Sequence, residues 1–319
     1  MALLQRVLSI AQLPSQRLLV PASAPLPRAV ARMACDAASP LAKRPRLASG
    51  APLRVGLVGL GAIGSRVAEA LGDGTTLPRA ELAAALVARP RPERPACCGE
   101  RALLTHEPEA FLAAQWDVCV EAAGQPWLRE HGRRVLMSGR DLLVTSIGAF
   151  TDDALHEDFV AAAEKSGARL LLAAGAMPGI DWMSSAALEG IAEARLVQRK
   201  RPEGWKGTPA EGKVDLDSID TPTVIFEGVA RQAAAQFPKN ANIAAMLAIA
   251  TVGLDKLQVQ LVADPTVSAP ASQIKLRGDA GELSIEVQGA AISQRTSRIV
   301  PLSVVKALRN LSSTEVVGV

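Results

Sequence analysis

Short apolar runs alternate with helix-patterned stretches through the first half of the chain. The apolar or β-rich runs are residues 53–58, 81–88, 117–122, 142–145 and 169–174. The stretches with helical spacing are residues 65–71, 126–138 and 151–166, the last capped by Thr151. Strands that alternate with helices are typical of a parallel sheet with helices on both faces. The pattern therefore predicts an α/β domain with a doubly wound parallel sheet at residues 51–175.

The pattern changes near residue 195, where fewer helices separate the strands. The predicted elements are strands at 195–200, 223–229, 257–263, 272–276 and 283–287 and an apolar helix at 243–251. They indicate a second domain of the α+β class at residues 176–300, built on a mixed, largely antiparallel sheet with one covered face. We expect this domain to bind the substrate and to form the oligomer contacts. Residues 202–221 are polar and rich in Gly, Pro and Asp, which predicts a mobile surface loop. We expect the amphipathic helix at 302–311 to pack back on the first domain.

A glycine motif, G-L-G-A-I-G at residues 59–64, separates the first predicted strand from the first predicted helix. The first glycine of such a motif permits a tight turn, the second lets the backbone approach a pyrophosphate, and the third lets the helix lie close to the strand. The helix N-terminus then offers N–H groups to the phosphates. The motif predicts a Rossmann-type dinucleotide site whose cofactor-binding residues are Gly59, Gly61, Ala62, Ile63 and Gly64.

The residue after the second predicted strand bears on the choice of cofactor. Sites that prefer NAD usually place an Asp or Glu there for the ribose 2′-hydroxyl, whereas this chain has Arg89, followed by Arg91. An arginine suits a 2′-phosphate, so we predict that NADP is accepted at least as well as NAD; alternatively, both arginines are solvated loop residues. The strand that ends at a partly buried Glu121 should line the same cleft through Ala123 and Gly124.

Residue counts exclude some chemistry. The 319 residues include no tyrosine, which excludes a reductase with a Tyr-Lys acid/base pair, and three histidines, none after residue 156. An active site in the second half must therefore work without imidazole, and we expect His131 and His156 to lie at the surface. The four cysteines have neither zinc-site nor disulfide-framework spacing, so we predict reduced thiols and no metal site.

Positive charge is concentrated in residues 1–50, which hold seven basic residues and one acidic residue. Residues 51–319 hold 28 basic and 31 acidic residues, so composition does not indicate nucleic acid as a partner, and no apolar run is long enough to predict a membrane span. The Arg-, Ala-, Ser- and Pro-rich start is typical of a disordered leader, here interpreted as a transit peptide for a mitochondrion or plastid. Alternatively, the protein is cytoplasmic, and this segment is a disordered tail, or an upstream extension if translation begins at Met33. A nuclear signal at residues 43–46 is a further alternative.

Three further segments carry a resemblance to a known family. They are G-A-M-P-G-I-D at 175–181, F-P-K-N-A-N at 237–242 and the strand end A-D-P at 263–265. With the glycine motif, they resemble the L-aspartate dehydrogenases, two-domain relatives of homoserine dehydrogenase and dihydrodipicolinate reductase, over residues 53–312. The resemblance implies oxidation of L-aspartate to iminoaspartate, which hydrolyses to oxaloacetate and ammonia or feeds pyridine-nucleotide synthesis. It also implies that Ala176 and Asn242 contact the cofactor near the nicotinamide.

The chain departs from this family pattern at a catalytic position. The family's proposed catalytic histidine lies seven or eight residues after A-D-P, where this chain has Ser272. A neutral serine cannot act as an acid or base near pH 7, whereas imidazole titrates there. We therefore expect either Lys239, with a pKa lowered by burial beside Arg295, or a water held by Ser272 and Asn242 to handle the proton.

A second family motif, N-P-K-T-S, is altered to S-Q-R-T-S at residues 293–297. Arg295 keeps the positive charge and can pair with a substrate carboxylate in bidentate fashion, while Thr296 and Ser297 match the motif. The resulting substrate-binding candidates are Lys239, Asn240, Arg295, Thr296 and Ser297.

Three interpretations of function stay open on the sequence. The chain is an L-aspartate dehydrogenase, or an NAD(P)-dependent dehydrogenase or imine reductase of another small amino or keto acid, or a catalytically weakened NAD(P)-binding homologue. A sheet with one exposed face often dimerises, so a homodimer or dimer of dimers is also expected.

Overall fold

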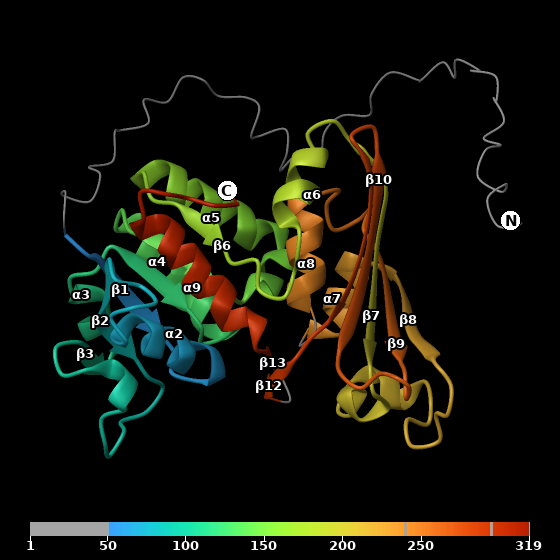
Figure 1. Ribbon diagram of the computed structural model, residues 1–319, viewed down its shortest axis with the longest axis horizontal. Helices are drawn as coiled ribbons and strands as arrows, with labels where there is room; N and C mark the ends of the chain where they lie inside the picture. Colours follow the sequence, from blue (N-terminus) through green and yellow to red (C-terminus); the bar gives the residue numbers. More distant parts are fainter. Residues whose placement is uncertain (1–50, 239–240, 294–295, 319) are drawn as a thin grey trace, which may run out of the picture.

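The computed structural model describes residues 51–238, 241–293 and 296–318, and it contains two sheets with helices between them (Figure 1). The leader, Lys239, Asn240 and Arg295 therefore lie outside the described residues. None of the described helices is long and apolar enough to cross a membrane. Three of the cysteines, Cys97, Cys98 and Cys119, lie in the described part, and all three are free thiols.

Sheet A is a six-stranded parallel sheet in the order β3-β2-β1-β4-β5-β6. Its strands are β1 (Leu53–Val58), β2 (Ala80–Leu86), β3 (Leu103–Thr105), β4 (Val118–Glu121), β5 (Asp141–Val144) and β6 (Leu170–Leu172). The central strands β1, β4 and β5 are almost entirely buried, as a parallel sheet covered on both faces requires. The predicted doubly wound sheet is confirmed, and the strand order places its switch point between β1 and β4.

Helices cover both faces of sheet A. One face carries α2 (Ala62–Gly72) and α9 (Ile299–Ser312), and the other carries α3 (Pro108–Ala113), α4 (Gln125–Met137), α5 (Asp153–Ser166) and the short helix η2 (Ile147–Thr151). Val304, Val305 and Leu308 of α9 share a buried cluster with α2, so the terminal helix does return to this domain. The cap of α5 is Asp152, whose carboxylate accepts from Leu155 N, so the prediction of Thr151 was wrong.

Sheet B is a five-stranded mixed sheet in the order β11-β10-β7-β9-β8, in which only β7 and β9 run parallel. Its strands are β7 (Ile191–Lys200), β8 (Thr223–Val229), β9 (Gln258–Ala263), β10 (Ala271–Gly278) and β11 (Gly281–Gln288). The face toward sheet A is covered by α6 (Ile180–Ala186), α7 (Ala230–Gln236) and α8 (Ala241–Ala250) (Figure 1). The small hairpin β12 (Ala291–Ser293) and β13 (Thr296–Ser297) leads from sheet B into α9.

The segment at 202–221 lies mostly at the surface, as the sequence predicted, but four of its residues are buried: Pro202, Trp205, Ala210 and Leu216. It forms two short helices, η3 (Pro202–Trp205) and η4 (Pro209–Gly212). Trp205 is fully buried, and its indole Nε1 donates to the carbonyl of Val262 at 3.1 Å. The buried indole ring thus attaches an otherwise polar and exposed segment to sheet B.

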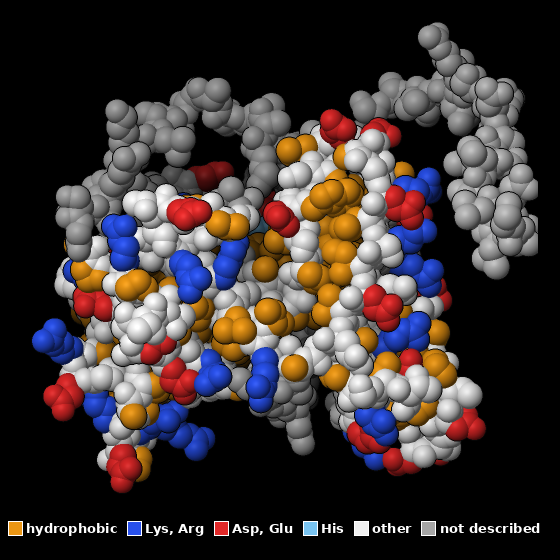
Figure 2. All heavy atoms as spheres, viewed as in Figure 1, with side chains coloured by type: hydrophobic (Ala, Val, Ile, Leu, Met, Phe, Trp, Pro, Cys, Tyr) orange, Lys and Arg blue, Asp and Glu red, His pale blue; other side chains and the backbone are white. Residues whose placement is uncertain are grey.

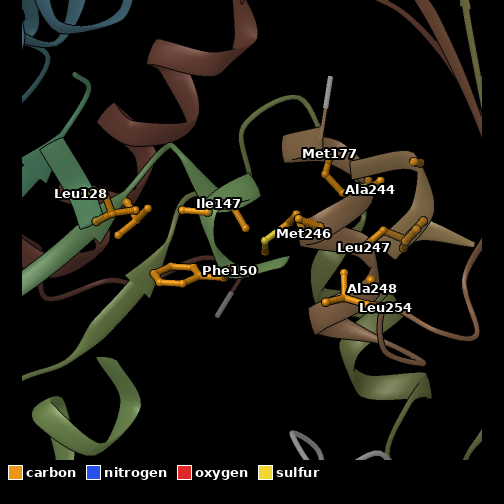
Figure 3. Packing of buried hydrophobic residues seen from close by; sticks show 14 of the residues in the cluster. Leu128, Ile147, Phe150, Met177, Ala244, Met246, Leu247, Ala248 and Leu254 are labelled. Carbon is orange, nitrogen blue, oxygen red and sulfur yellow. The ribbon is translucent and has the colours of Figure 1, made fainter. Parts of the chain in front are cut away.

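The two halves of the molecule share one hydrophobic cluster. Ile147 and Phe150 of η2 lie against the apolar helix α8, where Met246 and Leu247 are buried (Figure 3). Because α8 also packs on α7, which lies against β8 and β9, this cluster runs without interruption from sheet A to sheet B. The junction therefore holds the edge of one sheet at a fixed place relative to the other.

Candidate active site

The glycine loop between β1 and α2 has two crowded positions and one open position. Gly59 has φ +90°, and a Cβ there would lie 2.5 Å from the carbonyl oxygen of Ala122. A Cβ at Gly64 would lie 1.8 Å from the carbonyl oxygen of Gly59, so only glycine fits where the helix meets the strand. A Cβ at Gly61 would meet nothing within 4 Å. Packing thus explains Gly59 and Gly64, whereas the space above Gly61 is open to a ligand.

The start of α2 fits a pyrophosphate. Its N-cap is Gly61, which supplies no side-chain cap, and Ala62 and Ile63 form the first turn. The first N–H groups of a helix have no intrahelical partner, and together with the helix dipole they favour an anionic group. Open space over Gly61 and an uncapped helix start lie together at the carboxyl end of β1. This is the position where a dinucleotide binds in this class of sheet.

Glu121 organises the carboxyl ends of the neighbouring strands β4 and β5. This fully buried carboxylate accepts hydrogen bonds from the backbone N–H groups of Ala123 at 2.9 Å and Gly124 at 2.8 Å. It also accepts from Ser146, through the backbone N–H at 3.0 Å and the hydroxyl at 2.9 Å. Glu121 is thus more deeply buried than the sequence indicated, and it shapes the wall formed by Ala123 and Gly124 without facing a ligand.

Asn242 connects the second domain to this edge of sheet A. Its Oδ1, on the first turn of α8, accepts a hydrogen bond from Gly148 N at 2.8 Å. A Cβ at Gly148 would lie 2.8 Å from Gln125 Nε2 and 2.9 Å from Asn242 Oδ1, so three elements converge there. Asn242 itself is exposed.

The loop after β6 brings Ala176 to the same edge. Gly175 and Gly179 have φ +62° and +63°, and Gly175 N donates to Ser303 Oγ of α9 at 3.0 Å. A Cβ at Gly179 would lie 3.0 Å from Ile285 Cδ1 of β11, so the loop touches the inner face of sheet B. The half-buried Ala176 therefore lies between the dinucleotide edge and sheet B.

The two arginines after β2 differ in their contacts. Arg89 is exposed, whereas Arg91 Nη2 donates to the carbonyl of Leu60, inside the glycine loop, at 3.2 Å. Sequence reasoning singled out Arg89 because of its position at the strand end. The structure adds Arg91 as the arginine whose guanidinium lies against the dinucleotide loop.

Ser272 is half-buried near the start of β10, directly opposite Gln198 of β7. It shares the inner face of sheet B with Ile274 and Leu276, which are buried, because side chains two residues apart point to the same side of a strand. Ser297 Oγ donates to the carbonyl of Ala290 at 3.1 Å and so closes the loop before α9. The hairpin that carries Thr296 lies next to β11 in the chain.

The corner after β9 holds the A-D-P segment in a fixed shape. Asp264 is buried and accepts from Thr266 through the hydroxyl at 2.6 Å and the backbone N–H at 2.9 Å, and it pairs with Arg199 at 3.2 Å. The Thr266 hydrogen bonds and the Arg199 charge hold the pKa of this carboxyl below its usual range. Asp264 is therefore an ionised structural anchor for the segment that leads to Ser272.

His106 follows the carboxyl end of β3, whereas His131 and His156 lie within the helices α4 and α5. His106 is exposed beside Glu107, and His156 lies against Phe150 with 5.1 Å between ring centroids. His131 is 9% exposed, so the prediction of a surface position was wrong for it; α4 turns this residue toward Trp127, with ring centroids 5.2 Å apart.

Comparison with known proteins gives a consistent answer. The family profile "Aspartate dehydrogenase, C-terminal" matches residues 181–311, and "Homoserine dehydrogenase, NAD binding domain" matches residues 59–173. A protein from Ralstonia pickettii named L-aspartate dehydrogenase is 39% identical over 266 residues, which are 81% of this chain and 97% of that protein. One from Bordetella bronchiseptica named L-aspartate dehydrogenase 2 is 38% identical over 80% of this chain and 96% of its own length. The crystal structure of aspartate dehydrogenase from Thermotoga maritima matches with a TM-score of 0.66 and 25% identity, over 83% of this chain and 99% of that one.

Proposed function

The chain belongs to the L-aspartate dehydrogenase family, and we propose that it catalyses the NAD(P)-dependent oxidative deamination of L-aspartate. One observation carries the proposal beyond family membership. The dinucleotide edge of sheet A, the Ala176 loop and the inner face of sheet B meet at one place, linked by the Asn242–Gly148 and Gly179–Ile285 contacts. A cofactor bound at the carboxyl edge of sheet A would therefore lie next to the inner face of sheet B, where the substrate can bind.

The residues present define how the reaction is organised. The uncapped start of α2 holds the pyrophosphate, and the loops at Ala123 and Ala176 and the side chain of Asn242 line the nicotinamide end. When bound, NAD(P)⁺ accepts the hydride from C2 of aspartate. The amine nitrogen, having lost its proton, forms the C=N bond of iminoaspartate. Water then converts this product to oxaloacetate and ammonia, or the imine passes on to pyridine-nucleotide synthesis.

Ser272 gives this site a neutral side chain where the family pattern has its proposed catalytic histidine. A serine hydroxyl orients a substrate or a water by hydrogen bonding, but it does not titrate near neutral pH. The chain thus retains the positioning and hydride-transfer parts of the reaction, and a water held between Ser272 and Asn242 carries the proton. We expect a lower kcat than an imidazole-containing site would support.

The test is a substrate panel with the purified chain. NAD(P)H formation at 340 nm is measured with L-aspartate, L-glutamate, L-alanine and L-homoserine. NAD(P)H consumption is measured for the reverse reaction on oxaloacetate plus ammonia. Turnover with L-aspartate above the other amino acids supports the proposal. Turnover only with another substrate contradicts it and favours a related dehydrogenase, and tight cofactor binding without any turnover favours a non-catalytic homologue.

The cofactor proposal is that NADP is used at least as well as NAD. Arg91, whose guanidinium contacts the glycine loop, and Arg89 offer positive charge just after β2. Residues 87–92 contain no carboxylate that could bind a 2′-hydroxyl. The measurement is kcat/KM for both cofactors with L-aspartate saturating. A strong preference for NAD contradicts the proposal.

We also propose that the outer face of sheet B is the surface of a homodimer. That face is uncovered among the described residues, and charged side chains project from it at the right edge of Figure 2. Within the chain, Arg195 of β7 pairs with Glu227 of β8 at 3.8 Å, and Lys275 of β10 pairs with Glu282 of β11 at 3.6 Å, so this face carries both signs of charge and a second copy can meet it without a large net repulsion. Size-exclusion chromatography with light scattering should give twice the chain mass or four times it; a monomer at all concentrations contradicts this.

Residues 1–50 lie outside the described part of the structure, and we propose that they direct the protein to a mitochondrion or plastid. Their seven basic residues and one acidic residue support the proposal. A reporter fused to residues 1–50 should enter the organelle and lose the leader. A cytoplasmic, uncleaved reporter contradicts it.

A further inference from the structure

Three polar side chains lie together on the otherwise apolar inner face of sheet B: Gln198 and Lys200 of β7 and Ser272 of β10. Their neighbours on this face, Leu261 and Ile274, are buried. An apolar sheet face that packs on helices has no structural need for an amide, an ammonium and a hydroxyl at adjacent positions. The group therefore requires an explanation other than core packing.

The register of β7 and β10 brings these side chains within reach of one another. Ser272 pairs directly with Gln198, so their Cβ atoms are about 5 Å apart, as in any antiparallel pair. Lys200 lies two residues further along β7 on the same face, which puts it diagonal to Ser272, at roughly 7 Å and within reach of its long side chain. One small molecule can therefore contact all three.

The side chain of Gln198 has a feature that indicates a bound ligand. Its side chain is 5% exposed, and its Oε1 has no hydrogen-bond partner within the described part of the chain. A buried carbonyl oxygen left without a donor is costly, and most such atoms are paired in folded proteins. A bound group that donates an N–H to Oε1 removes this cost.

Lys200 is half-buried beside Trp205, with Nζ 4.8 Å from the centroid of the indole ring. Burial lowers the pKa of this lysine to about 8. The aromatic ring favours the charged form, so the ammonium is largely protonated at neutral pH yet poorly solvated. Such a cation gains from an anionic ligand, which replaces the water that it has lost.

The position of these side chains relative to the cofactor edge is set by two contacts. Trp205 packs against Phe237, 6.0 Å between centroids, and Phe237 begins the segment that leads to Asn242 at the Gly148 contact. On the other side, Val287 pairs with Ser272 and lies two residues from Ile285, which reaches Gly179. The inner face at Ser272 is thus bounded by the two segments that line the nicotinamide end.

We propose that Gln198, Lys200 and Ser272 form the amino-dicarboxylate recognition site of the enzyme. Lys200 pairs with one substrate carboxylate, Ser272 donates a hydrogen bond to the same carboxylate, and Gln198 Oε1 accepts one from the α-amino group. This inference rests on the proposed function and deepens it. It assigns the selection of aspartate to two residues of β7 that no family motif in the sequence identified.

The test separates the carboxylate contact from the amine contact. Succinate has both carboxylates of aspartate and no amine, so it serves as a competitive inhibitor that lacks the Gln198 partner. Lys200→Met should raise the KM for L-aspartate and the Ki for succinate at least tenfold each. Gln198→Met should raise the KM for L-aspartate by a similar factor and leave the Ki for succinate within twofold of the unchanged chain.

Controls keep the test decisive. Both variants should bind NADP with unchanged Kd, and Lys275→Met, on the outer face of the same sheet, should change none of these constants. If Lys200→Met fails to fold, Ser272→Ala replaces it, with the same rise expected for both constants. If the variants turn over aspartate with unchanged KM and Ki, this inference alone is wrong. If the unchanged chain does not turn over aspartate at all, the proposed function is wrong as well.

Discussion

Single residues decide how fast this site can work, and Ser272 is the first of them. Restoring an imidazole by Ser272→His places a group that titrates near neutral pH on the inner face of sheet B. We expect kcat with L-aspartate to rise at least tenfold, since a positioned acid or base contributes about 10²–10⁴-fold. The rate should also acquire a pH dependence near 6.5. An unchanged kcat and pH profile in a folded variant would show that position 272 does not face the reacting atoms.

The sequence predicted some site residues and missed others for physical reasons. Gly59 and Gly64 were recognisable because steric demands on a turn leave a local pattern. The contact of Asn242 with Gly148 joins residues 94 positions apart, so no local pattern contains it. Gln198 resembled any other residue of an alternating strand, and it is identified by its side-chain oxygen, which has no hydrogen-bond partner among the residues that the structure describes.

At the scale of elements, the start of α2 offers a test of where the cofactor binds. Gly61→Ala adds a methyl group into open space, so the apo chain should lose only the modest stability, about 1 kcal/mol or less, by which glycine is preferred to alanine at an N-cap. The same methyl group blocks the approach of the pyrophosphate, and the Kd for NADP should rise at least tenfold, about 1.4 kcal/mol. Gly212→Ala in η4, also with nothing within 4 Å of its Cβ, is the matched control and should change neither quantity. Equal NADP affinity in both variants would show that the pyrophosphate does not bind at the start of α2.

The register of β1 and β4 is supported by an ion pair that predicts a pH dependence. Arg54 donates to Asp117 from Nη2 at 2.7 Å and from the backbone N–H at 2.9 Å. Burial alone would raise the pKa of Asp117, but the hydrogen bonds and charge of Arg54 outweigh it and hold the pKa below its usual range. The stabilisation is therefore fully present above the unfolded pKa of about 3.9 and is lost as the pH falls through the lower, folded value.

Asp117→Asn removes this pH-dependent stabilisation. Because both side chains are partly exposed, the loss in Tm at pH 6 should be modest, about 2–4 °C, and it should shrink as the pH is lowered below about 4. Thermal melts of both chains between pH 3 and pH 6 measure it. A gap that stays constant over this range would mean that Asp117 stabilises the fold without its charge.

Element types were predictable wherever the apolar period was clear, as in β1, β4 and α5. The helix α7 was missed because its sequence, A-R-Q-A-A-A-Q, has only alanines on its buried side and no strong period. The short strand β3 was missed for lack of length. The packing of residues 202–221 depends on where Trp205 finds a partner, which is a tertiary property.

At the scale of the whole molecule, the shared cluster through η2 and α8 predicts cooperative unfolding. Because side chains of both sheets and of α8 belong to one buried cluster, neither sheet can lose its packing without disturbing that of the other. Scanning calorimetry should give one transition whose calorimetric and van't Hoff enthalpies agree, and added NADP should raise its Tm without splitting it. Two separate transitions would mean that the halves fold as independent units.

The central claim is that a hydride passes from C2 of L-aspartate to the nicotinamide on sheet A. Turnover of L-[2-²H]aspartate with NADP⁺ or NAD⁺, followed by mass spectrometry of the reduced cofactor, measures this transfer directly. We expect reduced cofactor that is heavier by one mass unit, formed in equal amount with ammonia, and no such shift with unlabelled aspartate. Reduced cofactor without deuterium, or no reduction at all, would contradict it.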